Sequence, residues 1–118
     1  MLRFRLRMEF TLQAWDEAIG VLRSLVGPVR AEPGCSATGL LRDADDSSAL
    51  TWVEEWRSGE DFEGHLRAMT FRRILAVMEL AAGAPVVEID DVASRRGFDL
   101  VAEILGRGEV GAAGRETA

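Results

Sequence analysis

The sequence predicts an α+β protein of the ferredoxin-like class, with the order strand–helix–strand–strand–helix–strand, an antiparallel sheet and helices on one face of it. Three observations predict this class: a strictly alternating N-terminal strand, apolar segments with helical spacing, and a polar turn between two short strands. The chain has 118 residues, which is room for one hydrophobic core. We therefore expect a single domain over residues 1–106 and a tail rich in Gly and Ala over residues 107–118.

The first strand and the first helix have the clearest patterns. Apolar and charged side chains alternate over residues 2–10, as in a half-buried strand. The apolar members are Leu2, Phe4, Leu6, Met8 and Phe10. Thr11 can cap a helix whose apolar residues recur three and four positions apart. These are Trp15, Ala18, Ile19, Leu22, Leu25, Val26 and Val29. We expect Gly27–Pro28 to kink or end this helix, because proline lacks a backbone donor.

The remaining elements follow from turn and capping signals. Strands are predicted over residues 35–42 and 49–57, joined into a hairpin by the polar residues 43–48. Ser58, followed by Asp61, resembles a capping box and predicts the start of a second helix.

A third helix is predicted from Thr70 to Gly83, a fourth strand over residues 86–92, and a short terminal helix from Phe98 to Leu105. The side chains expected on the inner face of the third helix are Phe71, Ile74, Leu75 and Met78.

The face of the sheet without helices also carries apolar side chains, and it must be buried elsewhere. In so small a chain the simplest cover is a second copy, so we predict a homodimer with the two sheets packed face to face. The row Arg3, Arg5 and Arg7 is expected to pair with acidic neighbours.

Composition excludes several classes of function. The net charge of −6 argues against a nucleic-acid partner. All 14 basic residues are Arg, and the chain has no Lys, Asn or Tyr, which excludes Schiff-base and phenol chemistry. A lone Cys35 excludes an intramolecular disulfide and a cysteine metal cluster. Without a long apolar run or a leader-like N-terminus, we expect no membrane contact and a cytoplasmic location.

Several motifs together carry a resemblance to a known family. They are Val53–Ser58, Phe62, His65–Arg67 and Phe71–Leu75, preceded by Ala31–Cys35 and Leu40–Asp43. The most specific part is a Glu-x-Trp strand followed, after a short gap, by a His and then a Phe. Over roughly residues 2–92 the chain resembles the antibiotic biosynthesis monooxygenase domain, of the dimeric α+β barrel superfamily.

The resemblance implies a homodimer with a pocket in each protomer between sheet and helices. Members of the family include cofactor-free oxygenases of anthrones and hydroquinones, haem-degrading enzymes and an isomerase of a small phosphorylated signal. The haem-degrading pattern departs from this chain, which has Leu75 where that pattern has an iron-ligating His, and His65 where it has Trp. The anthrone-oxidising members rely on Asn and Tyr, which are absent, so the quinol-oxidising members are nearest.

Two residues are candidates for catalysis. Glu54 lies between Trp52 and Trp56 on one face of its strand, and a carboxylate buried there must find hydrogen bonds or take up a proton. It is either a pocket acid or partner of His65, or a buried residue paired with an arginine such as Arg5 or Arg67. His65 is either a general base or donor to a substrate oxygen, or a packing residue tied to a backbone carbonyl.

The sequence and the resemblance together favour a cofactor-independent monooxygenase that acts on a quinol- or polyphenol-like small aromatic substrate with molecular oxygen. The catalytic residues would be His65 and Glu54, and neither a metal nor another cofactor is expected. The predicted substrate-binding residues are Trp52, Trp56, Phe62, Met69 and Phe71. Alternatives are a non-catalytic dimeric small-molecule-binding or stress-related module, and an isomerase of a small polar metabolite. Apolar pocket walls would favour the oxygenase, a filled pocket a structural role, and inward arginines an anionic substrate.

Overall fold

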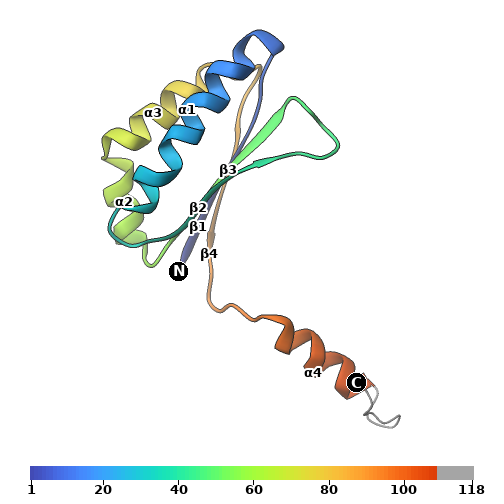
Figure 1. Cartoon of the computed structure of the whole chain (residues 1–118). Coiled ribbons are helices and arrows are strands. Elements are labelled where there is room, and N and C mark those ends of the chain that lie inside the picture. The colour runs from blue at the N-terminus through green and yellow to red at the C-terminus, as the bar shows by residue number, and fades with distance from the viewer. Residues whose placement is uncertain (109–118) are drawn as a thin grey trace.

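A four-stranded antiparallel sheet with helices on one face makes up the body of the molecule in the computed structural model (Figure 1). The structure describes residues 1–108. Its elements are β1 (Leu2–Glu9), α1 (Leu12–Arg30), β2 (Cys35–Arg42), β3 (Ala49–Trp56), α2 (Gly59–Leu66), α3 (Met69–Met78), β4 (Val86–Asp91) and α4 (Phe98–Gly108). The strands lie in the order β2-β3-β1-β4, which confirms the ferredoxin-like class.

The central strand β1 fixes the two faces of the sheet. Its residue Leu6 lies opposite Trp52 of β3 and Val87 of β4. The even-numbered side chains of β1 are buried beneath the helices, as the alternating pattern predicts. The arginines between them point to the other side, which we call the open face.

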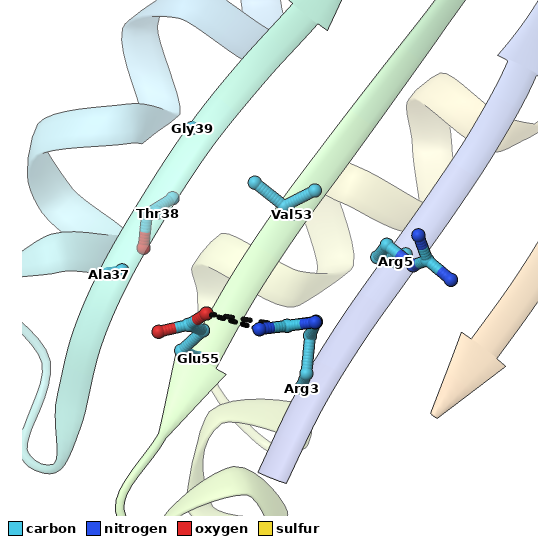
Figure 2. Close-up of a pocket in the computed structure, with 7 residues that line it drawn as sticks. All are labelled: Arg3, Arg5, Ala37, Thr38, Gly39, Val53 and Glu55. Carbon is cyan, nitrogen blue, oxygen red and sulfur yellow. Dashed lines mark hydrogen bonds and ion pairs between the residues drawn. The ribbon is translucent and has the colours of Figure 1, made fainter. Parts of the chain in front are cut away.

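The open face carries ion pairs between neighbouring strands. Arg3 bonds Glu55, and Arg5 bonds Glu88 at 2.7 Å, so the expected pairing of the arginine row with acidic neighbours is confirmed. Figure 2 shows the Arg3–Glu55 pair beside a shallow hollow of about 290 Å³, with Val53 at its centre. The Arg5–Glu88 pair is exposed, and a pair of this kind contributes little stability.

Helix α1 is longer than its proline suggests. The side chain of Thr11 accepts a hydrogen bond from the Ala14 amide, which confirms the N-cap. Of the two outcomes expected at Gly27–Pro28, a kink or an end, the end is wrong, because the helix continues to Arg30. Pro28 is exposed, while Val29 is fully buried, and the packing of Val29 on the core holds the last turn in place.

Helices α2 and α3 follow β3 directly. The Ser58 side chain accepts a hydrogen bond from the Asp61 amide at 3.1 Å, which confirms the cap of α2. In α3 the buried residues are Ile74 and Val77, whereas Leu75 is 44% exposed. The expectation for Leu75 is therefore wrong, because the three-residue step from Ile74 to Val77 defines the buried stripe and Leu75 falls outside it.

The C-terminal helix α4 lies apart from this body, beyond the end of β4 (Figure 1). The predicted tail, residues 107–118, falls largely outside the described residues and stays a prediction. Within residues 1–108, no helix combines the length and apolar character that crossing a membrane requires.

Candidate functional site

The candidate site begins at a buried carboxylate. Strand alternation turns Trp52, Glu54 and Trp56 of β3 toward the helices, and all three side chains are fully buried. The Trp52 indole Nε1 donates to Glu54 Oε2 at 2.7 Å, and the Trp56 indole Nε1 donates to Glu54 Oε1 at 2.9 Å. Glu54 therefore satisfies the only donor of each indole.

The third partner of Glu54 is His65. The capped start of α2 places Phe62 and His65 one turn apart on its inner face. His65 Nε2 lies 2.8 Å from Glu54 Oε2. The imidazole stacks on Trp56 with ring centroids 4.7 Å apart, and the Phe71 ring is T-shaped to it with centroids 5.4 Å apart. The hydrogen bond to Glu54 thus holds the imidazole within the plane of its ring, and the two aromatic rings restrict its movement out of that plane.

A second carboxylate holds the other nitrogen of His65. Glu32, in the turn after α1, lies with Oε1 2.8 Å from Nδ1, while the Thr70 hydroxyl donates to Oε2. We call Glu32, His65 and Glu54 the Glu–His–Glu network. Sequence reasoning missed Glu32 and Thr70 as site residues. The signal was present, since Glu32 belongs to one of the motifs that carry the family resemblance.

The network changes the acid–base behaviour of the only histidine. Burial of the imidazole lowers its pKa, but the hydrogen bonds and negative charges of Glu54 and Glu32 outweigh burial, so the pKa of His65 lies above its usual 6.5. In the cationic form both ring nitrogens donate, and each faces a carboxylate. The geometry therefore favours an imidazolium between two carboxylates.

Sequence reasoning offered an arginine as a structural partner of Glu54 and a backbone carbonyl as a structural partner of His65, and both partners are wrong. Arg5 pairs with Glu88, and Arg67 bonds the carbonyl of Glu63, so neither compensates Glu54. His65 is held by carboxylates at both nitrogens rather than by a backbone carbonyl.

The predicted site residues are only partly brought together. Trp52, Trp56, Phe62 and Phe71 surround the network, and Phe62 lies 6.4 Å from Trp56 between ring centroids. Met69 does not join them, because it begins α3 and is 61% exposed. The roles of these residues in catalysis and substrate binding stay predictions.

A shallow hollow gives access to the network from solvent. It has a volume of about 240 Å³ and lies between the turn after α1 and the helix α2. Its lining residues are Glu32, Pro33, Glu60, Asp61, Gly64 and His65. Glu32 retains some exposed surface, whereas the His65 side chain is covered, so Glu32 is the member of the network that meets solvent. The two buried indoles fill the space beneath His65.

Comparison with known proteins places the chain in a family. A family model described as antibiotic biosynthesis monooxygenase matches residues 4–77, which is well over half of the sequence. The chain belongs to the antibiotic biosynthesis monooxygenase family, as the motifs around Glu54 and His65 suggest. No match was found among curated proteins.

Solved structures share the fold over most of the chain. A crystal structure of an antibiotic biosynthesis monooxygenase is 24% identical, with a TM-score of 0.71, and covers 80% of this chain and 100% of its own. Rv0793 from Mycobacterium tuberculosis is 22% identical, with a TM-score of 0.74, over 81% of this chain and 98% of its own. PA3566 from Pseudomonas aeruginosa is 25% identical, with a TM-score of 0.69, over 79% of this chain and 94% of its own. About a fifth of this chain lies outside each superposition.

Proposed function

We propose that the protein is a cofactor-independent monooxygenase of a quinol- or polyphenol-like small aromatic substrate, with His65 and Glu54 as its catalytic pair. Family membership supports an oxygenase. The observation that carries the proposal is the Glu–His–Glu network, because a histidine held between two carboxylates is oriented for proton transfer, and its partner Glu32 meets solvent at the hollow.

The proposed reaction needs no external reductant. In the state in which His65 is neutral, a quinol gives up a hydroxyl proton to the network, and the resulting anion passes an electron to molecular oxygen. Recombination at a ring carbon gives a hydroperoxide, which loses water and leaves the hydroxylated quinone. One oxygen atom enters the ring and the other leaves as water, so the substrate supplies all four electrons. The protein contributes orientation and proton transfer.

The dimensions of the hollow favour a small substrate. Its volume of about 240 Å³ lies just below the ~300 Å³ at which typical ligand pockets begin, which suits one aromatic ring better than a fused system. Carboxylates on its rim can accept hydrogen bonds from phenolic hydroxyls.

The proposed substrate wall consists of Trp52, Trp56, Phe62, Met69 and Phe71. Of these, Phe71 is the half-buried member of the aromatic cluster, so a ring that reaches the indoles must displace it, and the exposed Met69 can contact such a ring only from outside the cluster.

A specific observation favours the non-catalytic alternative. Both indole donors and both imidazole nitrogens already have partners within the chain, as in a closed structural network. The isomerase alternative has less support, because the residues lining the hollow include three carboxylates and no arginine to hold an anionic metabolite.

Oxygen uptake tests the proposal. A panel of hydroquinones and anthrones is offered to the wild type, to His65→Ala and to Glu63→Gln, an exposed change on the same helix. We expect uptake with hydroquinones by the wild type and Glu63→Gln, and a loss of at least about 100-fold in His65→Ala, the range of general acid–base catalysis. Absence of uptake over the whole panel favours the binding module, and equal uptake in His65→Ala overturns the proposed mechanism.

We also propose that the working form is a homodimer with the open faces of the two sheets packed together. The half-buried Val53 and the shallow hollow around it support this arrangement, because they leave a central area without charged groups beside the Arg3–Glu55 pair (Figure 2).

A further inference from the structure

Helix α4 has an apolar face that nothing in the described part of its own chain covers. Phe98, Val101 and Leu105 recur at three- and four-residue spacing, with Ile104 beside them. Their exposed fractions run from 44% to 76%. An isolated helix of 11 residues is marginal in water, because such helices need about 12–15 residues even in favourable sequences. A covering surface for this face would supply the missing stability.

The charged side chains on the opposite face of α4 pair with one another and with Arg96, just before the helix. Arg96 bonds Asp99 at 2.8 Å and Glu103 at 3.0 Å, and Arg107 bonds Glu103 at 3.1 Å. The polar face thus has local partners, and the apolar face is the one that requires another surface.

A second uncovered apolar strip lies on β4. Because Val87 pairs with Leu6 and Ile89 with Phe4, these two side chains project on the helix side of the sheet. They are nevertheless 45% and 53% exposed, since β4 is the edge strand and the helices cover the strands beside it (Figure 1). One chain therefore carries both an apolar helix face and an apolar strand face without cover.

We propose that α4 is an exchanged arm, whose apolar face packs on the helix side of β4 in a second copy of this chain. The proposal rests on the homodimer proposed above and adds the segment that holds it. In a dimer with two-fold symmetry, α4 of each copy packs on β4 of the other, as in an isologous interface. The same contact, made twice, buries the apolar strips of both copies.

The available area agrees with a second copy as the occupant. The six exposed residues are 44% to 76% exposed, and on the order of 100 Å² or somewhat less from each gives roughly 500 Å² of apolar surface in each copy. A two-fold pair would bury about twice that amount. Stable interfaces begin near ~1,200 Å² in total, and the polar surface around these strips and the open face supply the remainder.

The position of α4 also argues against cover by its own body. The helix lies beyond the end of β4, away from the layer of α1 and α3 (Figure 1). It can therefore be replaced or altered without removing a packing contact from its own core, which makes substitutions there a clean test.

The first experiment measures the dimer dissociation constant of the full chain by analytical ultracentrifugation. The double variant Val101→Glu/Leu105→Glu is compared with Arg107→Gln, a change on the polar face. We expect the double variant to weaken the dimer at least tenfold and the control to match the wild type. A dimeric wild type with an unchanged double variant overturns the arm and leaves the homodimer, whereas a monomeric wild type overturns both.

The second experiment identifies the receiving surface by disulfide trapping. Two chains, each with Cys35→Ala, carry one new cysteine apiece: Ile89→Cys in one and Leu105→Cys in the other. After mixing and mild oxidation, we expect a covalent heterodimer on a non-reducing gel. The control replaces Leu105→Cys with Arg107→Cys on the polar face. Trapping no stronger than in this control overturns docking on β4.

Discussion

Glu54 is the single side chain on which most of the buried polar groups depend. It accepts hydrogen bonds from two indoles and lies against His65, all within the core. We expect Glu54→Leu to lower the free energy of unfolding by about 3 kcal/mol or more, because it leaves buried donors without an acceptor and a buried charge without its partner. Urea unfolding, followed by tryptophan fluorescence, measures the change.

The matched variant is Glu54→Gln, which keeps one acceptor oxygen in nearly the same volume. We expect a smaller loss than for Glu54→Leu, because one indole donor keeps its partner. Equal losses in the two variants would contradict the role assigned to the carboxylate, since the cost would then come from packing alone.

The raised pKa of His65 makes stability depend on pH. A group whose pKa is higher in the folded than in the unfolded state stabilises the fold fully below its unfolded pKa of about 6.5. That stabilisation is lost as the pH rises through the raised pKa of the folded state. We expect the free energy of unfolding of the wild type to fall over this interval, and that of His65→Gln to change less.

Because the chain has one histidine, its Hε1 ring proton gives a single resonance that can be titrated by NMR without assignment to one of several residues. We expect the midpoint in the wild type to lie above about 6.5 and to fall in Glu32→Gln, which removes one of the two charges. A wild-type midpoint at or below the ordinary value would contradict the network.

Part of this site could be predicted from the alternation of side chains between the two faces of a strand. Glu54 lies between two indoles because β-strand side chains alternate, and that needs only the sequence. Pairing with Arg5 could also have been rejected, because the alternation of β1 turns Arg5 away from the apolar side chains, and in the structure Glu54 lies opposite the apolar Phe4. The contact of Glu32 with His65 joins positions 33 residues apart. It depends on how a turn and a helix pack, which no local pattern encodes.

At the scale of single elements, the turn that carries Glu32 depends on Gly34. This residue has φ of +83°, and an added Cβ would collide with the side chain of Asp61. We expect Gly34→Ala to cost about 1–3 kcal/mol of stability, because the backbone conformation is strained for other residues. It should also alter the pKa of His65 by displacing Glu32.

The matched control is Gly20→Ala, in the exposed middle of α1, where an added Cβ meets nothing. We expect it to stabilise the protein by about 0.5–1 kcal/mol, since alanine is the better helix former. Thermal unfolding of both variants shows whether each substitution raises or lowers the stability. Stabilisation by Gly34→Ala would contradict the role of the turn.

The elements themselves were predictable where a local signal acts alone. The alternation of β1 and the caps Thr11 and Ser58 are such cases, and the structure confirms them. Pro28 and Leu75 were misjudged because tertiary packing decides both. Burial of Val29 carries the helix past its proline, and the contact of α3 with α1 selects the buried stripe.

At the scale of the whole molecule, the proposed contact between open faces predicts the effect of a charge at its centre. Val53 lies opposite Arg5 and Gly39 in the middle of the sheet. We expect Val53→Asp to weaken the dimer at least tenfold, about 1.4 kcal/mol, because a carboxylate would be buried against the same face of the partner. Analytical ultracentrifugation measures it, with Thr51→Ser as the control.

The loss of affinity in Val53→Asp is separable from the arm. If the two contacts act together, each variant alone weakens the dimer and their combination yields a monomer. If Val53→Asp leaves the dissociation constant unchanged, the sheets do not pack through this face.

The stacking of Trp56 on His65 makes the network optically visible. A protonated imidazole quenches the fluorescence of an indole at van der Waals distance, and these rings lie 4.7 Å apart between centroids. The emission of the native protein should therefore brighten as the imidazolium loses its proton, and a ligand that takes up or donates a proton there should change the same signal. The core thus contains its own reporter, by which candidate ligands can be screened in solution without a label and before any reaction is known.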